Sequence, residues 1–157
     1  GAIKKAREIG ALTIGLSNTP SSLLEQLVEI PITPKVGPEV IMGSTRMKAG
    51  TSQKLVLNMI STSVMIKLGK VYGNLMVDLK PTNQKLVHRA IRIIRLATVI
   101  SQEEAQNYLA LSGNHPKTAI LMVKTGYSRE QAIALLDQAN GLISKALSLF
   151  EQNQRTK

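Results

Sequence analysis

The hydrophobic and polar positions of this chain follow different periods in its successive stretches. Short apolar runs between polar turns fill residues 1–33, one long apolar stretch fills residues 46–68, and helical spacing dominates residues 82–150. Short apolar runs bounded by turns predict strands, and apolar positions three or four residues apart predict helices. We therefore expect a mixed α/β region followed by a region of helices alone.

The first stretch predicts a helix that leads directly into a strand of a parallel sheet. Residues 2–9 carry basic side chains in their last turns and are followed by Gly10, whereas residues 12–16 are mostly apolar. This order is the second half of a β-α-β unit whose first strand is not in the sequence. Because a lone parallel strand leaves its backbone unpaired, we expect the sequence to come from a longer protein; the alternative is a natural start at an unusual place.

Polar residues 17–22 follow this strand at its carboxyl end, where open α/β sheets place their ligands. A short helix over residues 23–27 and a second strand over residues 29–33 come next. Prolines and glycines then forbid a helix through residues 34–43. The long apolar stretch that follows, residues 46–68, has apolar side chains on nearly every face of a helix, which predicts a central, buried helix.

Short helices with clear start signals fill the rest of the chain. Gly69 ends the long helix, a loop over residues 71–74 follows, and Thr82 or Asn83 caps the next helix. Ser101 and Ser128 begin two capping boxes, since a glutamate or glutamine stands three residues after each. The last four helices are expected near residues 102–111, 116–124, 129–138 and 141–150. They form a small separate unit, which resembles a ubiquitin-associated-type module over residues 122–136.

Composition narrows the classes of function. The chain has 157 residues, no cysteine, 20 lysines and arginines, and 10 aspartates and glutamates. The lack of cysteine excludes a disulfide scaffold, a thiolate zinc site and a cysteine nucleophile, and it favours a cytoplasmic protein. Residues 55–66 form the longest apolar stretch, which is shorter than the roughly 20 residues of a membrane span, so we expect no membrane partner.

The positive charge is concentrated between Lys35 and Arg95, which raises nucleic acid as a partner. Single-stranded nucleic acid binds on aromatic stacking platforms, and this segment has only one aromatic residue, Tyr72. We therefore expect no nucleic-acid partner, and we favour a small phosphorylated ligand.

The loop that leads into the long helix is the most informative segment. Free N–H groups of a first helical turn favour an anion, yet Arg46 and Lys48 place two cations at this positive end. Ser44, Thr45 and Thr51 add hydroxyl donors. Together these residues form a candidate anion site. The alternative is that both cations point to solvent and that Ser44 only caps the helix.

Glu39 is the one carboxylate in this loop. It is a candidate for proton transfer at a sugar carbon. Equally, it can form a structural ion pair with Arg46 or Lys48. A single glutamate does not make an active site, so both interpretations stay open.

The same segment resembles a signature shared by N-acetylmuramic acid 6-phosphate etherases and the glucokinase regulatory protein. The positions that match are Gly37, Pro38, Glu39, Gly43, Ser44, Thr45, Arg46, Lys48, Gly50, Thr51 and Lys54. The similarity continues through residues 54–59 and 69–78, and it is there specific to the etherase branch.

The resemblance implies a sugar isomerase (SIS) domain, which is a parallel sheet flanked by helices, followed by a small helical C-terminal domain. Residues 1–100 would be the C-terminal part of the SIS domain, with its N-terminal half missing, and residues 101–157 a ubiquitin-associated-like domain. The etherases are lyases of bacterial peptidoglycan recycling, which cleave the D-lactyl ether of N-acetylmuramic acid 6-phosphate to N-acetylglucosamine 6-phosphate and D-lactate. The implied partners are a phosphorylated amino sugar and a second copy in a homodimer, with no metal or redox cofactor.

One departure from the family limits this expectation. The family's two catalytic glutamates and the serine/threonine loop that holds the sugar phosphate belong to the half that precedes this chain, so we expect the chain alone to be inactive. Glu39 is then the only candidate catalytic residue. The candidate substrate-binding residues are Ser44, Thr45, Arg46, Lys48 and Thr51. The alternative from another class is a regulatory protein that binds a sugar phosphate without turnover.

Overall fold

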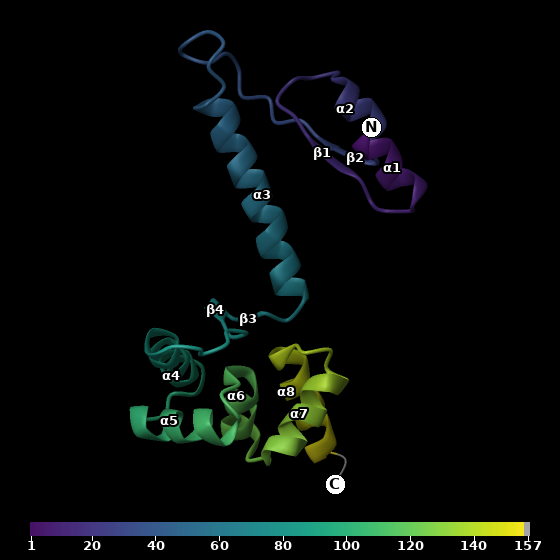
Figure 1. The fold of residues 1–157 in the computed structure, drawn as a ribbon. Helices are drawn as coiled ribbons and strands as arrows, with labels where there is room; N and C mark the ends of the chain where they lie inside the picture. Colours follow the sequence, from purple (N-terminus) through teal and green to yellow (C-terminus); the bar gives the residue numbers. More distant parts are fainter. Residues whose placement is uncertain (156–157) are drawn as a thin grey trace. The chain divides into compact units, whose positions relative to one another are not determined.

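The computed structural model describes residues 1–155, which fold as two compact units. The first unit covers residues 1–62 and the second covers the described residues from 63 onward, and the division falls within helix α3 (Lys48–Lys67). Figure 1 labels the helices and strands of both units. In the part of the chain that the structure describes, no helix is long and apolar enough to cross a lipid bilayer.

The first unit contains a small parallel sheet. Its elements are α1 (Ala2–Glu8), β1 (Ile14–Leu16), α2 (Leu23–Leu27) and β2 (Ile30–Ile32). The two strands pair in parallel, with Gly15 opposite Pro31, and α2 forms the crossover and packs on both strands. Gly15 permits this close packing, because a Cβ atom there would lie 2.9 Å from a methyl group of Val28. The expectation of a mixed α/β chain is therefore confirmed, with strands that are few and short.

The long helix α3 differs from its prediction. Of its 20 residues only Ala49 is buried, whereas Leu57 and Met59 are 58% and 60% exposed. The prediction of a buried helix is wrong for the described chain. Apolar side chains on all faces indicate that a helix needs cover from several sides, and residues 1–155 do not provide it.

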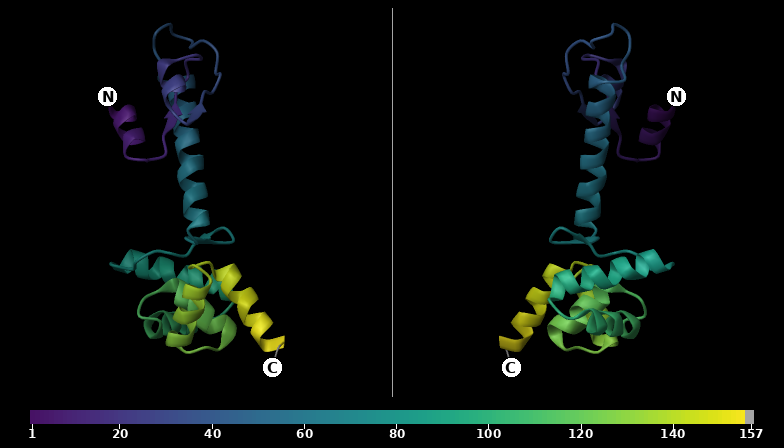
Figure 2. Two further views of the ribbon diagram at one scale, coloured as in Figure 1. Left: turned by 90° about the vertical axis from the view of Figure 1, so that its right-hand side faces the viewer. Right: turned by 90° about the vertical axis from the view of Figure 1, so that its left-hand side faces the viewer.

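After the last residues of α3, the second unit contains a hairpin and then five helices. The hairpin joins β3 (Val71–Tyr72) to β4 (Leu75–Met76) through a glycine–asparagine turn in which Gly73 has a φ of 59°. This segment was expected to be a loop. The helices, which Figures 1 and 2 show gathered in one bundle, are α4 (Gln84–Thr98), α5 (Gln102–Leu111), α6 (Pro116–Thr125), α7 (Arg129–Gln138) and α8 (Ile143–Arg155).

Local start signals place these helices as the sequence predicts. The Asn83 side chain accepts a hydrogen bond from the backbone N–H of Leu86 and caps α4. The capping boxes that begin at Ser101 and Ser128 are both formed, so these predictions are confirmed. Gly126 ends α6 with a φ of 71°, in the left-handed region that glycine adopts at little cost.

A single hydrophobic core holds the second unit together. Helix α4 packs on α5 and α6, and one cluster of buried side chains joins them, with Ile94, Ile120, Leu121 and Ile143 almost fully buried. The compact unit therefore begins before residue 101, and the helices from Ser101 onward share their core with α4. The family assignments of residues 1–100 and 101–157 stay predictions.

The shared core gives a direct test of this boundary. We expect Ile94→Ala to lower the free energy of unfolding of the second unit by about 2–5 kcal/mol, because it leaves a cavity among α4, α5 and α6. Leu96, on the same helix, is 59% exposed, so Leu96→Ala is the matched control and should change stability by no more than about 0.5 kcal/mol. Urea unfolding followed by circular dichroism measures both variants, and equal losses would contradict a core that includes α4.

Candidate functional site

The first turn of α3 is closed by the carboxylate of Glu39. The backbone N–H groups of Lys48 and Ala49 donate to its two oxygens at 3.1 and 3.0 Å. The Lys48 ammonium turns back and donates to the carbonyl oxygen of Pro38 at 2.9 Å. The anion expected at this helix terminus is thus a side chain of the loop itself.

These hydrogen bonds determine the ionisation of Glu39. The backbone N–H groups of Ala49 and Lys48 donate to its charged form and hold the pKa of the carboxyl below the ordinary glutamate value. Glu39 is therefore ionised at neutral pH and accepts hydrogen bonds without donating any. The structural interpretation predicted an ion pair between Glu39 and the side chain of Arg46 or Lys48. The structure shows neither pair, since the Glu39 carboxylate binds backbone N–H groups instead.

The other predicted site residues surround this helix start without joining one another. Ser44 is half-buried, whereas Thr45, Arg46 and Thr51 are exposed. The carbonyl oxygen of Thr45 accepts from the N–H of Gly50 at 3.0 Å, which tightens the turn into α3. In residues 1–155 the Arg46 guanidinium takes part in no hydrogen bond or ion pair, so its charge is available to a ligand.

Sequence reasoning missed Asn18 and Ser52 as members of the site. Asn18 follows β1, and its side-chain amide donates to the Pro34 carbonyl at 3.0 Å and to the Ser52 hydroxyl at 2.8 Å. Ser52 in turn donates to the carbonyl oxygen of Ala49 at 2.8 Å. This chain of bonds ties the carboxyl end of β1 to the first turn of α3. The only available signal was the polar turn after the strand, since the contact with Ser52 is distant in sequence.

Asn18 also leaves one polar atom unsatisfied. Its side-chain carbonyl oxygen, Oδ1, is buried and accepts no hydrogen bond from any described residue. A buried acceptor without a donor costs free energy, and a hydroxyl or N–H group of a ligand would satisfy it. A separate open hollow of about 490 Å³ lies at the start of α3, and it is lined by Val36, Met47, Lys48, Thr51, Ser52 and Leu55 but not by Asn18.

The carboxylates of the first unit have structural partners. Glu8 pairs with Lys5, Glu25 accepts from the N–H of Ser21, and Glu29 accepts from Thr13. Glu39 accepts hydrogen bonds from the first turn of α3, so none of the four carboxylates of the first unit is free to act as an acid or base. Nor do residues 1–155 bring together three His, Asp or Glu side chains that could hold a metal ion. Proton transfer at this site would therefore need groups from elsewhere.

Comparison with known proteins agrees with this picture. Residues 73–116 match a family model described as the C-terminal lid domain of glucokinase regulatory protein. An N-acetylmuramic acid 6-phosphate etherase from Clostridium acetobutylicum is 57% identical over 149 residues, which is 95% of this chain and 49% of the relative. The chain is a homologue of these etherases.

Other relatives carry the same name. The N-acetylmuramic acid 6-phosphate etherase of Caldanaerobacter subterraneus is 54% identical over 95% of this chain and 49% of its own length. N-acetylmuramic acid 6-phosphate etherase 2 of Vibrio cholerae is 50% identical over 97% of this chain and 50% of its own length. The chain thus spans about half the length of the etherases that it matches.

The cap formed by Glu39 predicts how the start of α3 responds to substitution and to acid. A glutamine at this position loses the charge and can accept only through one oxygen, so in Glu39→Gln we expect faster amide hydrogen exchange at Lys48 and Ala49. Because the folded-state pKa is lowered, the carboxylate stabilises the helix start above the unfolded-state pKa. This contribution is lost as the pH falls through the folded-state pKa, so the protection of both amides, taken relative to their intrinsic exchange rates at each pH, should decrease in acid.

The matched control is Glu103→Gln. Glu103 also lies in the first turn of a helix, α5, but it is not the residue that closes the capping box. Exchange rates at Lys48 and Ala49, measured by two-dimensional NMR, should be unchanged in this variant. If the exchange rates at Lys48 and Ala49 are the same in Glu39→Gln as in Glu103→Gln, the Glu39 carboxylate does not stabilise the start of α3.

Proposed function

We propose that this chain is part of an etherase that cleaves the D-lactyl ether of N-acetylmuramic acid 6-phosphate, giving N-acetylglucosamine 6-phosphate and D-lactate. The observation that carries the proposal is identity of 50–57% to three proteins of that name over nearly the whole chain. The loop and helix start around Glu39 support it, since the residues that resemble the family signature gather there. This activity makes the protein a carbon–oxygen lyase of amino-sugar metabolism in the bacterial cytoplasm.

The chain's own contribution is to bind the phosphorylated amino sugar. Arg46 supplies an unpaired guanidinium for the phosphate, and Ser44, Thr45, Thr51 and Lys48 supply further donors beside it. Because Glu39 already occupies the first-turn N–H groups of α3, the phosphate binds to these side chains rather than to the helix terminus.

A sugar hydroxyl completes the site on its other side. The Oδ1 atom of Asn18 needs one donor, and it lies at the carboxyl end of β1, where parallel sheets place their ligands. A hydroxyl of the bound sugar donates to it, which gives the ligand a neutral contact away from its phosphate.

Elimination of lactate needs a base at C2 of the sugar and an acid at the leaving oxygen. Glu39 is ionised, so it cannot serve as the acid, and its lowered pKa and the backbone N–H groups bound to both of its oxygens make it a poor base. The acid and base therefore come from the part of the etherase that this chain does not match. The exposed apolar surface of α3 and the short β1–β2 pair agree with a larger SIS-type sheet, to which residues 1–100 belong. Residues 101–157 would form the helical C-terminal domain, and the whole etherase would act as a homodimer.

A sugar-phosphate-binding regulatory protein is the second candidate. The match of residues 73–116 to the lid domain of glucokinase regulatory protein favours it. Such a protein would bind the phosphorylated sugar and release no product, so a product assay separates the two functions.

The assay compares this chain alone with a chimera. The chimera joins this chain to the half of the Clostridium acetobutylicum etherase that it does not match. We expect the chimera to release D-lactate from N-acetylmuramic acid 6-phosphate and the chain alone to release none. Binding of the sugar phosphate by the chimera without any D-lactate would favour the regulatory candidate. Release by the chain alone at a comparable rate would assign the proton transfer to its own residues.

Substitution of Arg46 tests the phosphate contact in the same chimera. Loss of a charge-assisted hydrogen bond should weaken binding of the phosphorylated sugar by about 10-fold or more in Arg46→Ala. Arg46→Lys keeps the charge but loses the two-pronged geometry, so an intermediate loss is expected. Calorimetric titration measures the affinities.

The control for this experiment is Lys54→Ala, which removes another exposed cation from α3. It should leave the affinity nearly unchanged. The melting temperature of Arg46→Ala without ligand should stay the same or rise, because a cation is removed from the positive end of the helix dipole. A clear fall in melting temperature with unchanged affinity would instead make Arg46 a structural residue.

A further inference from the structure

A second polar cavity lies in the second unit, outside the site described above. It has a volume of about 280 Å³ and lies where the loop after β4 meets the first turn of α6 and the α7–α8 connection. Asp78, His115, Lys117, Thr118, Asp137 and Gly141 are among the residues that line it. Its size suits a ligand smaller than a sugar phosphate.

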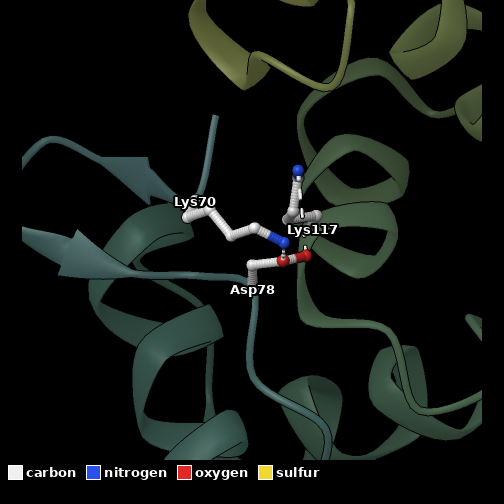
Figure 3. Close-up of polar contacts among 3 residues, drawn as sticks. All are labelled: Lys70, Asp78 and Lys117. Carbon is white, nitrogen blue, oxygen red and sulfur yellow. Dashed lines mark hydrogen bonds and ion pairs between the residues drawn. The ribbon is translucent and has the colours of Figure 1, made fainter. Parts of the chain in front are cut away.

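Lys117 is the most unusual group of this cavity. Its side chain is only 15% exposed, and its ammonium takes part in no hydrogen bond among residues 1–155. Asp78 lies between Lys70 and Lys117 (Figure 3), but it is hydrogen-bonded to Lys70, and its other oxygen is 3.9 Å from the Lys117 nitrogen. The ammonium therefore retains donors for a further acceptor.

The pKa values of Lys117 and Asp78 are each set by burial and by the neighbouring charges. Burial lowers the pKa of Lys117, Asp78 raises it in part, and the charge of Lys70 lowers it again, so that the result is a lowered pKa. Burial raises the pKa of Asp78, but the hydrogen bond from Lys70 and the charges of both lysines outweigh it, and the pKa is lowered. The Lys70–Asp78 pair is thus balanced, and Lys117 carries the charge that lacks a close partner.

Thr118 adds an independent observation. It is only 4% exposed and lines the cavity, yet its hydroxyl makes no hydrogen bond with any residue of the described chain. Among residues 1–155 the only fully buried side-chain polar atom without a partner is Oδ1 of Asn18, so the unbonded Thr118 oxygen keeps some access to solvent. Other buried or half-buried threonines of the same unit are satisfied, since Thr98 and Thr125 each donate to a backbone carbonyl at 2.7 Å. The hydroxyl of Thr118 is therefore an open position in the cavity.

The first turn of α6 also favours a bound acceptor. Its N-cap residue, His115, gives no side-chain hydrogen bond to the turn, and Pro116 follows at the first helical position. The positive end of the helix dipole is left without the anionic or polar cap that α5 and α7 have. An acceptor bound in the cavity would meet Lys117, Thr118 and this helix end together.

The carboxylates in the cavity determine which anion fits. Asp78 and Asp137 both line it, so an ion with two negative charges would be repelled, whereas a single carboxylate would balance Lys117. Asp137 is exposed and forms no ion pair with any described residue, and it accepts hydrogen bonds from donors such as hydroxyl groups. A ligand that carries one carboxylate and a neighbouring hydroxyl satisfies both ends of the cavity.

We propose that this cavity binds a small 2-hydroxy monocarboxylate. Its carboxylate accepts hydrogen bonds from the Lys117 ammonium and the Thr118 hydroxyl, and its hydroxyl donates to Asp137. The site lies in the second unit and does not rest on the proposed function, because none of its residues belongs to the loop and helix start around Glu39.

NMR titration of the full chain tests the proposal. Glycolate, acetate and inorganic phosphate are each added at constant ionic strength, and the backbone amides of Thr118, Ala119 and Gly141 are followed. We expect saturable shifts with glycolate, weaker binding of acetate because it lacks the hydroxyl, and the weakest binding of phosphate. Shifts that stay linear for all three ions, or tighter binding of phosphate than of glycolate, would overturn the proposal.

Three variants separate ligand binding from a structural role. Lys117→Met keeps the aliphatic stem and should weaken glycolate binding about 10-fold or more, whereas Lys145→Met, which removes an exposed lysine of α8, should not. Thr118→Val has nearly the same shape without the hydroxyl. It should weaken glycolate binding several-fold while the melting temperature of the free chain stays the same or rises. A lower melting temperature in Thr118→Val, or equal affinities in the two lysine variants, would contradict the assignment.

Discussion

The bond between the Glu39 carboxylate and the first turn of α3 is the constraint on which the candidate site depends. This helix begins with two cations, Arg46 and Lys48, at the positive end of its dipole, so its start needs an anion close by. Glu39 supplies that anion from the loop before the helix and folds residues 38–48 into a closed turn. With the helix start fixed in this way, Ser52 lies against Asn18 at the end of β1, and Arg46 keeps its charge for a ligand.

The two units differ in how much of their apolar surface they bury. The second unit buries one continuous core from Val77 to Ala146 and caps α4, α5 and α7 with its own side chains. In the first unit, two short strands and α2 cover little of the apolar surface, and α3 leaves its leucines and methionines exposed. The chain spans about half the length of its etherase relatives.

Local signals predicted the fold well, and non-local ones did not. The capping boxes at Ser101 and Ser128 were predicted correctly, because a cap depends on residues three positions apart. The β3–β4 hairpin was missed although Gly73 and Asn74 are typical turn residues, since its strands have only two residues each. The burial of α3 was predicted wrongly because an all-round apolar pattern shows that a helix needs cover, not that the chain supplies it. The link between Asn18 and Ser52 spans distant positions and had no local signal, and the binding roles of Ser44, Thr45, Arg46, Lys48 and Thr51 stay predictions.

The pKa of the Glu39 carboxyl, measured by carbon-13 NMR as the pH is varied, tests the central claim most directly. If Glu39 is the ionised cap of α3, its side-chain carboxyl should titrate below the ordinary glutamate value. The signals of the Lys48 and Ala49 amides should change over the same pH range, because both N–H groups donate to this carboxylate. A pKa at or above the ordinary value, with no coupled change at the two amides, would contradict the account and would restore Glu39 as a candidate for proton transfer.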